Sequence, residues 1–404
     1  MKIDKERLWN HLMELKEIGK NSDGSVTRFP FTNEDKQAQE QIVEWMSNAG
    51  LNVHIDYVGN IIGTLQGSDE TLPAIMCGSH YDSVKNGGAF DGCLGVLAGI
   101  EVLQTLIENK IQPKRSIQVV GFKDEEGNRF PYGMVGSKSI CATFGKEGFS
   151  SQDESGISLY DAMSSFGLQP DRYRECQLHP FMFLEIHIEQ ARLLEDRDKA
   201  IGIVQGIAGL SRFTISIHGE CAHAGATPMA YRHDPVVAMS EWILHISELS
   251  KQYQGMVATI GSIQTNPGVC NVICDHVTYT LDLRSLKDED RKQVMEVIKS
   301  FNKELEIKHG VSITMIEEQC LVSCLCDEIL QDTLKSICIE KNIPYEELVS
   351  GAGHDCMNFK DICKVAMIFV RSKAGYSHRK EEFSSKEDCA LGAEILYEFL
   401  LKQV

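Results

Sequence analysis

The segment from Gly78 to Gly95, GSHYDSVKNGGAFDGCLG, carries the first residues that could do chemistry. It supplies His80, then Asp82 two residues later, and a further carboxylate at Asp91. Imidazole and carboxylate together suit zinc or a similar first-row divalent ion. Glycine lets the backbone turn tightly enough to aim such side chains at one point. The segment therefore predicts part of a metal site, with a glycine-rich loop around an incidental histidine as the plainer alternative.

Residues of the same kinds recur at the ends of other predicted strands. Glu125 and Glu126 follow the buried run 116–122, and adjacent side chains there point different ways, so one can bind metal while the other faces substrate. His187 lies in LEIHIEQ and His378 in GYSHRK. Each alone has a structural alternative, a solvated Glu pair or a core histidine. Together with the first segment they supply five ligands, enough for two metals if one carboxylate bridges.

The elements that must position these residues form an α/β pattern. Buried strands are predicted at 74–77, 116–122, 181–188 and 365–370, and an apolar helix at 94–107. Because α/β enzymes place their sites at the carboxyl ends of strands, the five ligands should meet at one edge of one sheet. Amphipathic helices and a hairpin complete this part of the chain, at 4–18 with Asp4 as N-cap, 34–49, 53–65 (the hairpin), 327–341 and 386–402.

A different pattern interrupts the α/β part. From Arg212 the order reads β-α-β-β-α-β, with elements at 212–220, 235–250, 257–264, 272–284, 288–308 and 311–317. This order is the split ferredoxin-like sandwich. We therefore predict a discontinuous catalytic domain, residues 1–210 and 326–404, with an inserted lid at 211–325. The edge strands and helices of the insertion have no evident cover, which favours a symmetric dimer formed through residues about 212–320.

Composition limits the partners. The 404 residues include 40 Lys and Arg against 58 Asp and Glu, a net charge of −18, which argues against nucleic acid or an anionic membrane as the main partner. No run of about 18 apolar residues occurs and the N-terminus is amphipathic, so a cytoplasmic protein is expected. The 14 cysteines are scattered without a CxxC pair, typical of reduced thiols. A thiolate metal site at Cys320, Cys324 and Cys326 would lack a matching partner cluster.

Seven motifs together identify a family. They are GSHYDSVKNGGAFDG, DEEGNRF, EIHIEQ, GECAHAGATPM, NVICD followed by LDLR, SGAGHD, and IFVRSKAGYSH followed by SSKEDCA. With them the chain resembles the zinc-dependent amidase/hydantoinase/carbamoylase group of the aminoacylase-like di-metal peptidase superfamily. N-carbamoyl-L-amino acid hydrolases are most similar, and allantoate amidohydrolases come next. The resemblance implies a di-metal exopeptidase-like α/β domain with an inserted ferredoxin-like lid and dimerisation domain.

The resemblance also implies a ligand set for two divalent metal ions per chain. His80, a bridging Asp91 and His187 would hold one ion, while Asp91, Glu126 and His378 would hold the other. Zinc is the expected metal, with manganese, cobalt or nickel as alternatives. A histidine at position 187, rather than a carboxylate, is similar to the amidohydrolases and less so to the related carboxypeptidases.

Catalytic and substrate-binding residues follow from the same resemblance. Glu125 would be the general base and acid. The remaining residues would hold the substrate: His223, Asn271 and Arg284 from the lid, with Gln190 and the backbone near Gly353. In the resembling family, lid residues of this kind can come from the partner subunit. The chain departs from the family pattern at Ala191, where a glycine is usual, and after His378, where Arg379 and Lys380 replace a small residue and proline.

Elementary chemistry agrees with these roles. Two ions acidify a water between them and polarise a carbonyl, and Glu125 could move the proton to the leaving nitrogen. His223 could stabilise an oxyanion, its alternative being a structural histidine in a glycine-rich turn. The planar fork of Arg284 suits a substrate carboxylate, its alternative being an ion pair with Asp282.

These inferences predict a di-metal hydrolase of linear amide bonds. The substrate would be a small anionic ureido acid, an N-carbamoyl-L-amino acid that yields the amino acid, CO2 and ammonia. Allantoate is the alternative within the class, because it also carries a carboxylate and a ureido group and RFPYGMVGSKS resembles those enzymes equally. Ureidopropionate, ureidoglycolate and peptides are further alternatives. A catalytically silent binding protein would have lost a ligand or Glu125, and all of them are present here.

Overall fold

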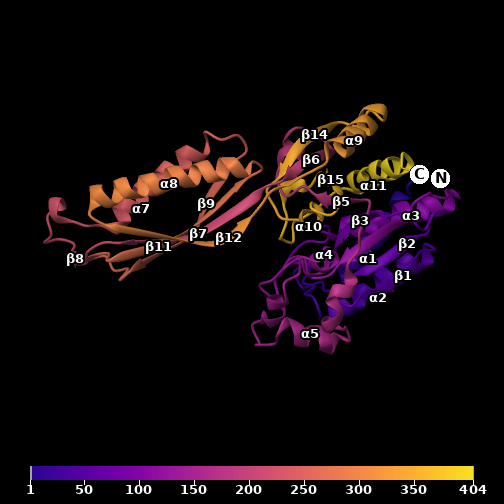
Figure 1. Ribbon diagram of the computed structural model, residues 1–404, viewed down its shortest axis with the longest axis horizontal. Coiled ribbons are helices and arrows are strands. Elements are labelled where there is room, and N and C mark those ends of the chain that lie inside the picture. The colour runs from indigo at the N-terminus through magenta and orange to yellow at the C-terminus, as the bar shows by residue number, and fades with distance from the viewer. Residues whose placement is uncertain (1, 404) are drawn as a thin grey trace. The chain divides into compact units, whose positions relative to one another are not determined.

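The computed structural model describes residues 2–403, and the chain forms two compact units (Figure 1). The first unit comprises Met1–Gln205, Leu325–Leu348 and Ala352–Val404. The second comprises Gly206–Cys324 and Val349–Gly351. Their limits lie near the boundaries predicted at residues 210 and 325, and the mixed α/β character predicted from the sequence is confirmed. No helix within residues 2–403 is long and apolar enough to span a membrane.

A nine-stranded sheet forms the centre of the first unit, in the order β1-β2-β4-β3-β5-β15-β6-β13, with β14 paired to β6. Its strands are β1 (Asn52–Ile55), β2 (Ile61–Leu65), β3 (Ile75–His80), β4 (Ile117–Phe122), β5 (Met182–Ile188), β6 (Ile201–Ile207), β13 (Cys324–Leu325), β14 (Tyr345–Ser350) and β15 (Lys364–Val370). The predicted hairpin is β1 and β2, which pair antiparallel.

Four central strands of this sheet run parallel. β3 pairs with β4 so that His80 lies opposite Phe122, and β5 pairs in parallel with both β3 and β15. These strands are buried on both faces, which is why they appear in the sequence as continuous apolar runs. Because their carboxyl ends share one edge, the residues that follow them are brought together, as the sequence predicted.

Helices cover the faces of this sheet. α3 (Cys93–Glu108) is apolar on nearly all sides and packs on β3, β4 and β5. α1 (Lys5–Glu17) and α11 (Lys386–Leu401) pack on α3, and their N-caps Asp4 and Ser385 accept backbone N–H groups. The other helices are α2 (Asn33–Asn48), α4 (Val135–Ile140), α5 (Leu159–Phe166), α6 (Leu193–Asp196), α9 (Glu328–Glu340) and α10 (Cys356–Phe359).

The second unit is an antiparallel sheet with two helices on one face (Figure 1). Its strands lie in the order β12-β7-β11-β9, the order of a ferredoxin-like sandwich, and the predicted β-α-β-β-α-β succession is present. The elements are β7 (Gly209–His218), α7 (Pro235–Ser250), β9 (Val257–Asn266), β11 (His276–Ser285), α8 (Asp288–His309) and β12 (Ser312–Leu321). Alternate residues of β7 and β11 are buried against α7 and α8, as a half-covered sheet requires.

Strand prediction was incomplete at several places, among them the two-residue strands β8 (Ala222–His223) and β13 (Cys324–Leu325). β6 was missed: only Ala208 separates it from β7, and the strand predicted at 212–220 covers only the later part of β7. β14 was missed because its alternation is weak and half of it is polar. The single strand predicted at 272–284 is wrong in its extent: the chain forms β10 (Val272–Ile273), breaks, and continues as β11.

A buried ion pair anchors the end of β4 next to the candidate site. The Lys123 ammonium lies 2.7 Å and 2.8 Å from the two Asp35 carboxylate oxygens, and neither side chain has exposed surface. The backbone N–H of Phe31 also donates to Asp35, and that of Lys123 donates to Asn60. Two full charges are therefore desolvated together, and each depends on the other.

We expect Lys123→Met to lower the free energy of unfolding by about 3–5 kcal/mol, because it leaves the Asp35 carboxylate buried without its cation. Urea denaturation followed by circular dichroism measures this. Lys20→Met is the control, since the Lys20–Glu17 pair is largely exposed and should contribute little. Equal stability of the two variants would contradict the assignment.

Candidate metal centre

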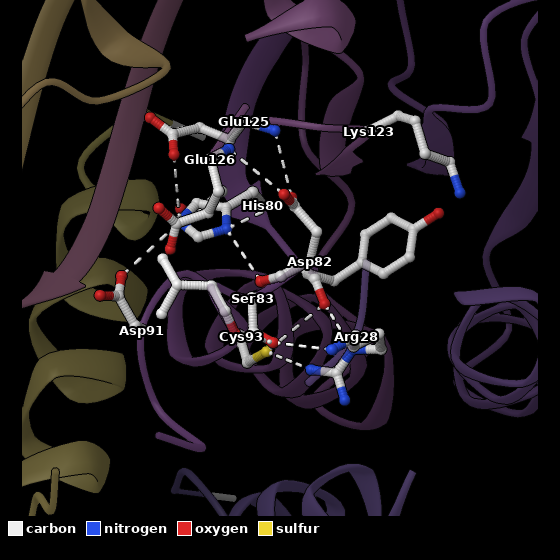
Figure 2. Close-up of polar contacts among 12 residues, drawn as sticks. Arg28, His80, Asp82, Ser83, Asp91, Cys93, Lys123, Glu125 and Glu126 are labelled. Carbon is white, nitrogen blue, oxygen red and sulfur yellow. Dashed lines mark hydrogen bonds and ion pairs between the residues drawn. The ribbon is translucent and has the colours of Figure 1, made fainter. Parts of the chain in front are cut away.

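His80, the last residue of β3, lies in the middle of the candidate site (Figure 2). Its Nε2 atom is 3.6 Å from Asp91 Oδ1 and 3.8 Å from Glu125 Oε2. Its Nδ1 atom faces Asp82, 3.5 Å from Oδ1 and 3.3 Å from the carbonyl oxygen. The Asp82 carboxylate also accepts the backbone N–H groups of Glu125 and Glu126. Asp82 therefore orients the imidazole and the Glu pair, which is what a residue behind a ligand does.

Two groups of possible ligands share the Asp91 carboxylate. His80, Asp91 and His187 form one, and Asp91, Glu126 and His378 form the other, with the ligand atoms of each group within 4.8 Å of one another. Asp91 Oδ1 lies 2.9 Å from His187 Nε2, while Oδ2 lies 3.4 Å from His378 Nε2. The carboxylate thus turns one oxygen to each group, the arrangement that a bridging ligand needs. A further group of three joins His80 with Glu125 and Glu126.

The two groups differ in burial. His80 and His187 are almost fully buried, whereas the His378 side chain is 51% exposed. His378 also has a left-handed backbone, with φ of 59°, which is unusual for a residue with a side chain. The group containing His378 is therefore the more open one, where a substrate atom could reach a bound ion.

The charges of this cluster are held at an energetic cost. Burial, with the charge of Asp91, raises the pKa of Glu126 well above its usual value, and burial with the neighbouring Glu126 does the same to the pKa of Glu125. Burial opposes the charged form of His80, yet Asp82 and Asp91 raise its pKa well above the usual value. Such a set of buried carboxylates and imidazoles fits divalent metal ions, which would neutralise the carboxylates.

Glu382 is a residue of the site that the sequence did not reveal. Its buried Oε1 accepts the backbone N–H groups of Phe90 and Asp91 at 2.8 Å and 2.9 Å. Gly88 makes this approach possible, because a Cβ atom there would lie 2.2 Å from the Glu382 carboxyl carbon. Glu382 follows His378 by four residues. Its hydrogen bonds therefore link the segment that carries His378 to the segment that carries Asp91. Within the polar sequence RKEEF it looked like a surface carboxylate.

Residues behind His187 were also missed. Glu185, on the same strand, accepts the Ser79 hydroxyl at 2.7 Å and the Cys356 backbone N–H at 2.9 Å. The buried His354 ring lies edge-on to the His187 ring, with centroids 4.5 Å apart. His354 directly follows Gly353 in the SGAGHD motif, and this position was the available signal.

Gln190 lies beside the shared carboxylate. Its amide donates to Asp91 Oδ2 at 3.2 Å, and the Ser377 hydroxyl also donates a short hydrogen bond to this oxygen. Ala191, next to it, does not adopt a positive φ, so a side chain at this position causes no backbone strain. The left-handed turn instead falls on Gly375, where a Cβ atom would meet the Ala191 backbone at 2.2 Å. The family-type glycine is therefore not needed at position 191.

Three predicted substrate-binding residues lie in the second unit. His223 Nδ1 accepts the backbone N–H groups of Gly225 and Ala226 at 3.0 Å and 3.1 Å. A neutral imidazole held in this way carries its proton on Nε2, which can then donate a hydrogen bond. Asn271 is exposed, and its carbonyl accepts the Ala224 N–H.

Arg284 makes the ion pair that the sequence left as its alternative role. Its Nε and Nη2 atoms donate to the two oxygens of Asp282 at 2.8 Å and 3.1 Å, and Nη1 donates to the Gly351 carbonyl at 2.6 Å. Arg212 also donates to Asp282. A substrate carboxylate at Arg284 would compete with Asp282 for the same guanidinium N–H groups.

We expect Glu382→Ala to weaken metal binding by about 10–100-fold, because the Asp91 loop loses its two hydrogen bonds to that carboxylate. Competition with a chromophoric chelator measures the affinity, and circular dichroism checks the fold. Glu381→Ala is the matched control, since the Glu381 carboxylate makes an exposed ion pair with Arg379. An unchanged affinity in Glu382→Ala would show that Asp91 holds its place without this support.

The model of peptidase family M20/M25/M40 matches residues 50–402. The chain is 43% identical to an N-carbamoyl-L-amino acid amidohydrolase of Geobacillus stearothermophilus, over 98% of this chain and 97% of that protein. It is 33% identical to an allantoate amidohydrolase of Bacillus subtilis, over 98% and 97%. A solved hydantoinase/carbamoylase-family amidase from Burkholderia multivorans superposes with a TM-score of 0.93 at 30% identity, covering 100% of this chain and 98% of that one.

The family inferred from the seven motifs is thus confirmed by matches over nearly the full length. The chain belongs to peptidase family M20/M25/M40.

Proposed function

We propose that this protein is a di-metal amidohydrolase that removes the carbamoyl group of N-carbamoyl-L-amino acids, giving the amino acid, CO2 and ammonia. The observation that carries the proposal is the Asp91 carboxylate, which turns one oxygen toward each of two ligand groups. The 43% identity to an N-carbamoyl-L-amino acid amidohydrolase supports this substrate class.

Five side chains would hold the two ions, with zinc as the proposed metal: His80, Asp91 and His187 for one, and Asp91, Glu126 and His378 for the other. Bound ions of this kind polarise the scissile carbonyl and acidify water. Asp82 and Glu382 hold His80 and Asp91 in position.

Glu125 is the acidic residue left for proton transfer. Burial and Glu126 make it more basic than an ordinary carboxylate, so it can take a proton from the attacking water and deliver it to the leaving nitrogen. His223 would donate from Nε2–H to the developing oxyanion. Arg284, with Gln190, Asn271 and the backbone near Gly353, would hold the substrate, and the guanidinium would bind its carboxylate.

Allantoate is the second candidate substrate. It presents the same two groups, a carboxylate and a ureido group, and the chain is 33% identical to an allantoate amidohydrolase. The identity to the N-carbamoyl-L-amino acid enzyme is higher over a similar length, and we therefore place that substrate class first.

We also propose a symmetric dimer formed through the second unit, about residues 212–320. β9 and β12 are edge strands of its sheet, with exposed apolar side chains that include Val257, Ile263 and Ile316. Unpaired edges of this kind favour association with a second copy. In such a dimer His223 would serve the partner's site.

Glu125→Gln should keep both ions but lower turnover by on the order of 10² to 10⁴, because the general base is lost. Glu126→Gln is the matched variant, which should instead lose metal. Ammonia release from N-carbamoyl-L-amino acids and allantoate gives the turnover, and elemental analysis should give about two ions per chain. Near-normal turnover of Glu125→Gln, full activity after complete chelation, or hydrolysis of neither substrate would refute the proposal.

Mixing the inactive variants Glu125→Gln and His223→Ala tests the dimer. If His223 acts across the interface, one site of each heterodimer regains both intact groups, and up to about half the activity of a normal dimer should return. Native mass spectrometry verifies subunit exchange. Exchange without recovered activity would place His223 in its own chain's site or outside catalysis.

A further inference from the structure

Arg284 already binds a carboxylate of its own chain. Asp282 precedes it by two residues on β11, so both side chains project from the same face of the strand. Arg284 Nε and Nη2 donate to the two Asp282 carboxylate oxygens at 2.8 Å and 3.1 Å. This two-bond pairing of a guanidinium with a carboxylate is the pairing that the proposed substrate would make. Asp282 therefore occupies the position of a ligand carboxylate.

A second arginine, Arg212, shares Asp282 with Arg284. It lies directly opposite Asp282 in the β7–β11 ladder, and its Nη2 atom donates to Asp282 Oδ2 at 2.9 Å. Burial opposes the charged form of Asp282, yet hydrogen bonds from Arg284 and Arg212 hold its pKa below the usual value. The three side chains together carry one net positive charge. A second carboxylate can therefore be paired here while Asp282 keeps a cation.

Each arginine is also held by a neutral acceptor. Arg284 Nη1 donates to the Gly351 carbonyl at 2.6 Å, and Arg212 Nη1 donates to Gln319 Oε1 at 3.3 Å. All these residues belong to the second unit. Neither contact involves Asp282, so both guanidinium groups stay anchored when that carboxylate turns from one to the other. Because the side chains of Asp282 and Arg284 are 23% and 29% exposed, a carboxylate from solution can reach them.

We propose that Arg212 is a positioning residue for substrate binding, which receives Asp282 when a substrate carboxylate takes its place on Arg284. This inference rests on the proposed function, which assigns the substrate carboxylate to Arg284. Without Arg212, the displaced Asp282 would be left half-buried with no cation, which is costly. Asp282 in turn sets a threshold, because a ligand must displace it. The exchange thus disfavours anions that only Arg284 would hold and favours substrates that bind at further points.

The exchange predicts opposite effects of substitutions at positions 282 and 212. Asp282→Asn should lower the KM for N-carbamoyl-L-amino acids by about 3–10-fold, because the competing charge is lost. Arg212→Gln should raise that KM by about tenfold, because the displaced carboxylate has no second cation. In both variants kcat should change little, since the substitution alters binding and not the reaction step. Arg212→Lys, which keeps the charge, should have a smaller effect than Arg212→Gln.

The double variant separates the exchange from a purely structural role of Arg212. In the Asp282→Asn chain, Arg212→Gln should leave KM unchanged, because no displaced carboxylate remains to be received. Thr214→Val is the matched control, since Thr214 lies two residues further on the same face of β7, and it should not change KM. An Arg212→Gln effect that adds in full to that of Asp282→Asn, or that falls on kcat alone, would overturn the proposal.

Propionate tests the exchange without turnover, because it carries a carboxylate and no ureido group. Ligand-observed nuclear magnetic resonance measures its affinity for the zinc-loaded full-length protein. Asp282→Asn should bind propionate more tightly than the unaltered protein and Arg212→Gln more weakly, and adding Arg284→Gln should remove both differences. Equal affinities of these proteins would overturn the exchange. Failure of the unaltered protein to release ammonia from either substrate would instead refute the proposed function, and the propionate affinities would still decide the exchange.

Discussion

The position of one carboxylate constrains the rest of the site. Asp91 must present an oxygen to each ligand group, so its backbone can move little without breaking one of them. The fold holds that backbone from two sides. Glu382 accepts the Asp91 N–H, and Gly92 brings the chain so close to His80 that a Cβ atom would lie 2.4 Å from the ring. The glycines of this segment are therefore required by close contact, in addition to turning the chain.

The same site concentrates charge where the fold would otherwise exclude it. Asp82, Asp91 and the two adjacent glutamates lie at the edge of a sheet that is buried on both faces. Hydrogen bonds from backbone amides and the orienting contacts to histidines compensate part of the desolvation cost. The raised pKa values of Glu125 and Glu126 reflect the part of this cost that is not compensated. Divalent cations would offset the remainder, which couples metal binding to the stability of this edge.

Sequence reasoning could group the candidate ligands because periodicity and ligand chemistry are local properties. Parallel strands appear as apolar runs, and the residues after them must meet, so His80, Glu126 and His378 could be assigned to one edge without a structure. Glu382 and His354 could not be assigned in this way. Their roles depend on backbone amides and rings that lie far away in the sequence, and nothing in RKEEF distinguishes a buried carboxylate from a solvated one. β6 was lost for a related reason, since the end of a strand is not visible when the next begins after one residue.

In the second unit, a single turn is enough to orient the His223 ring as a hydrogen-bond donor. Two backbone amides at a turn fix the acceptor nitrogen of His223, and the proton is then left on the opposite side of the ring. The turn follows β8, which forms with β10 a separate two-stranded ladder of two pairs. A short ladder is easily reshaped, which would suit the role proposed for His223.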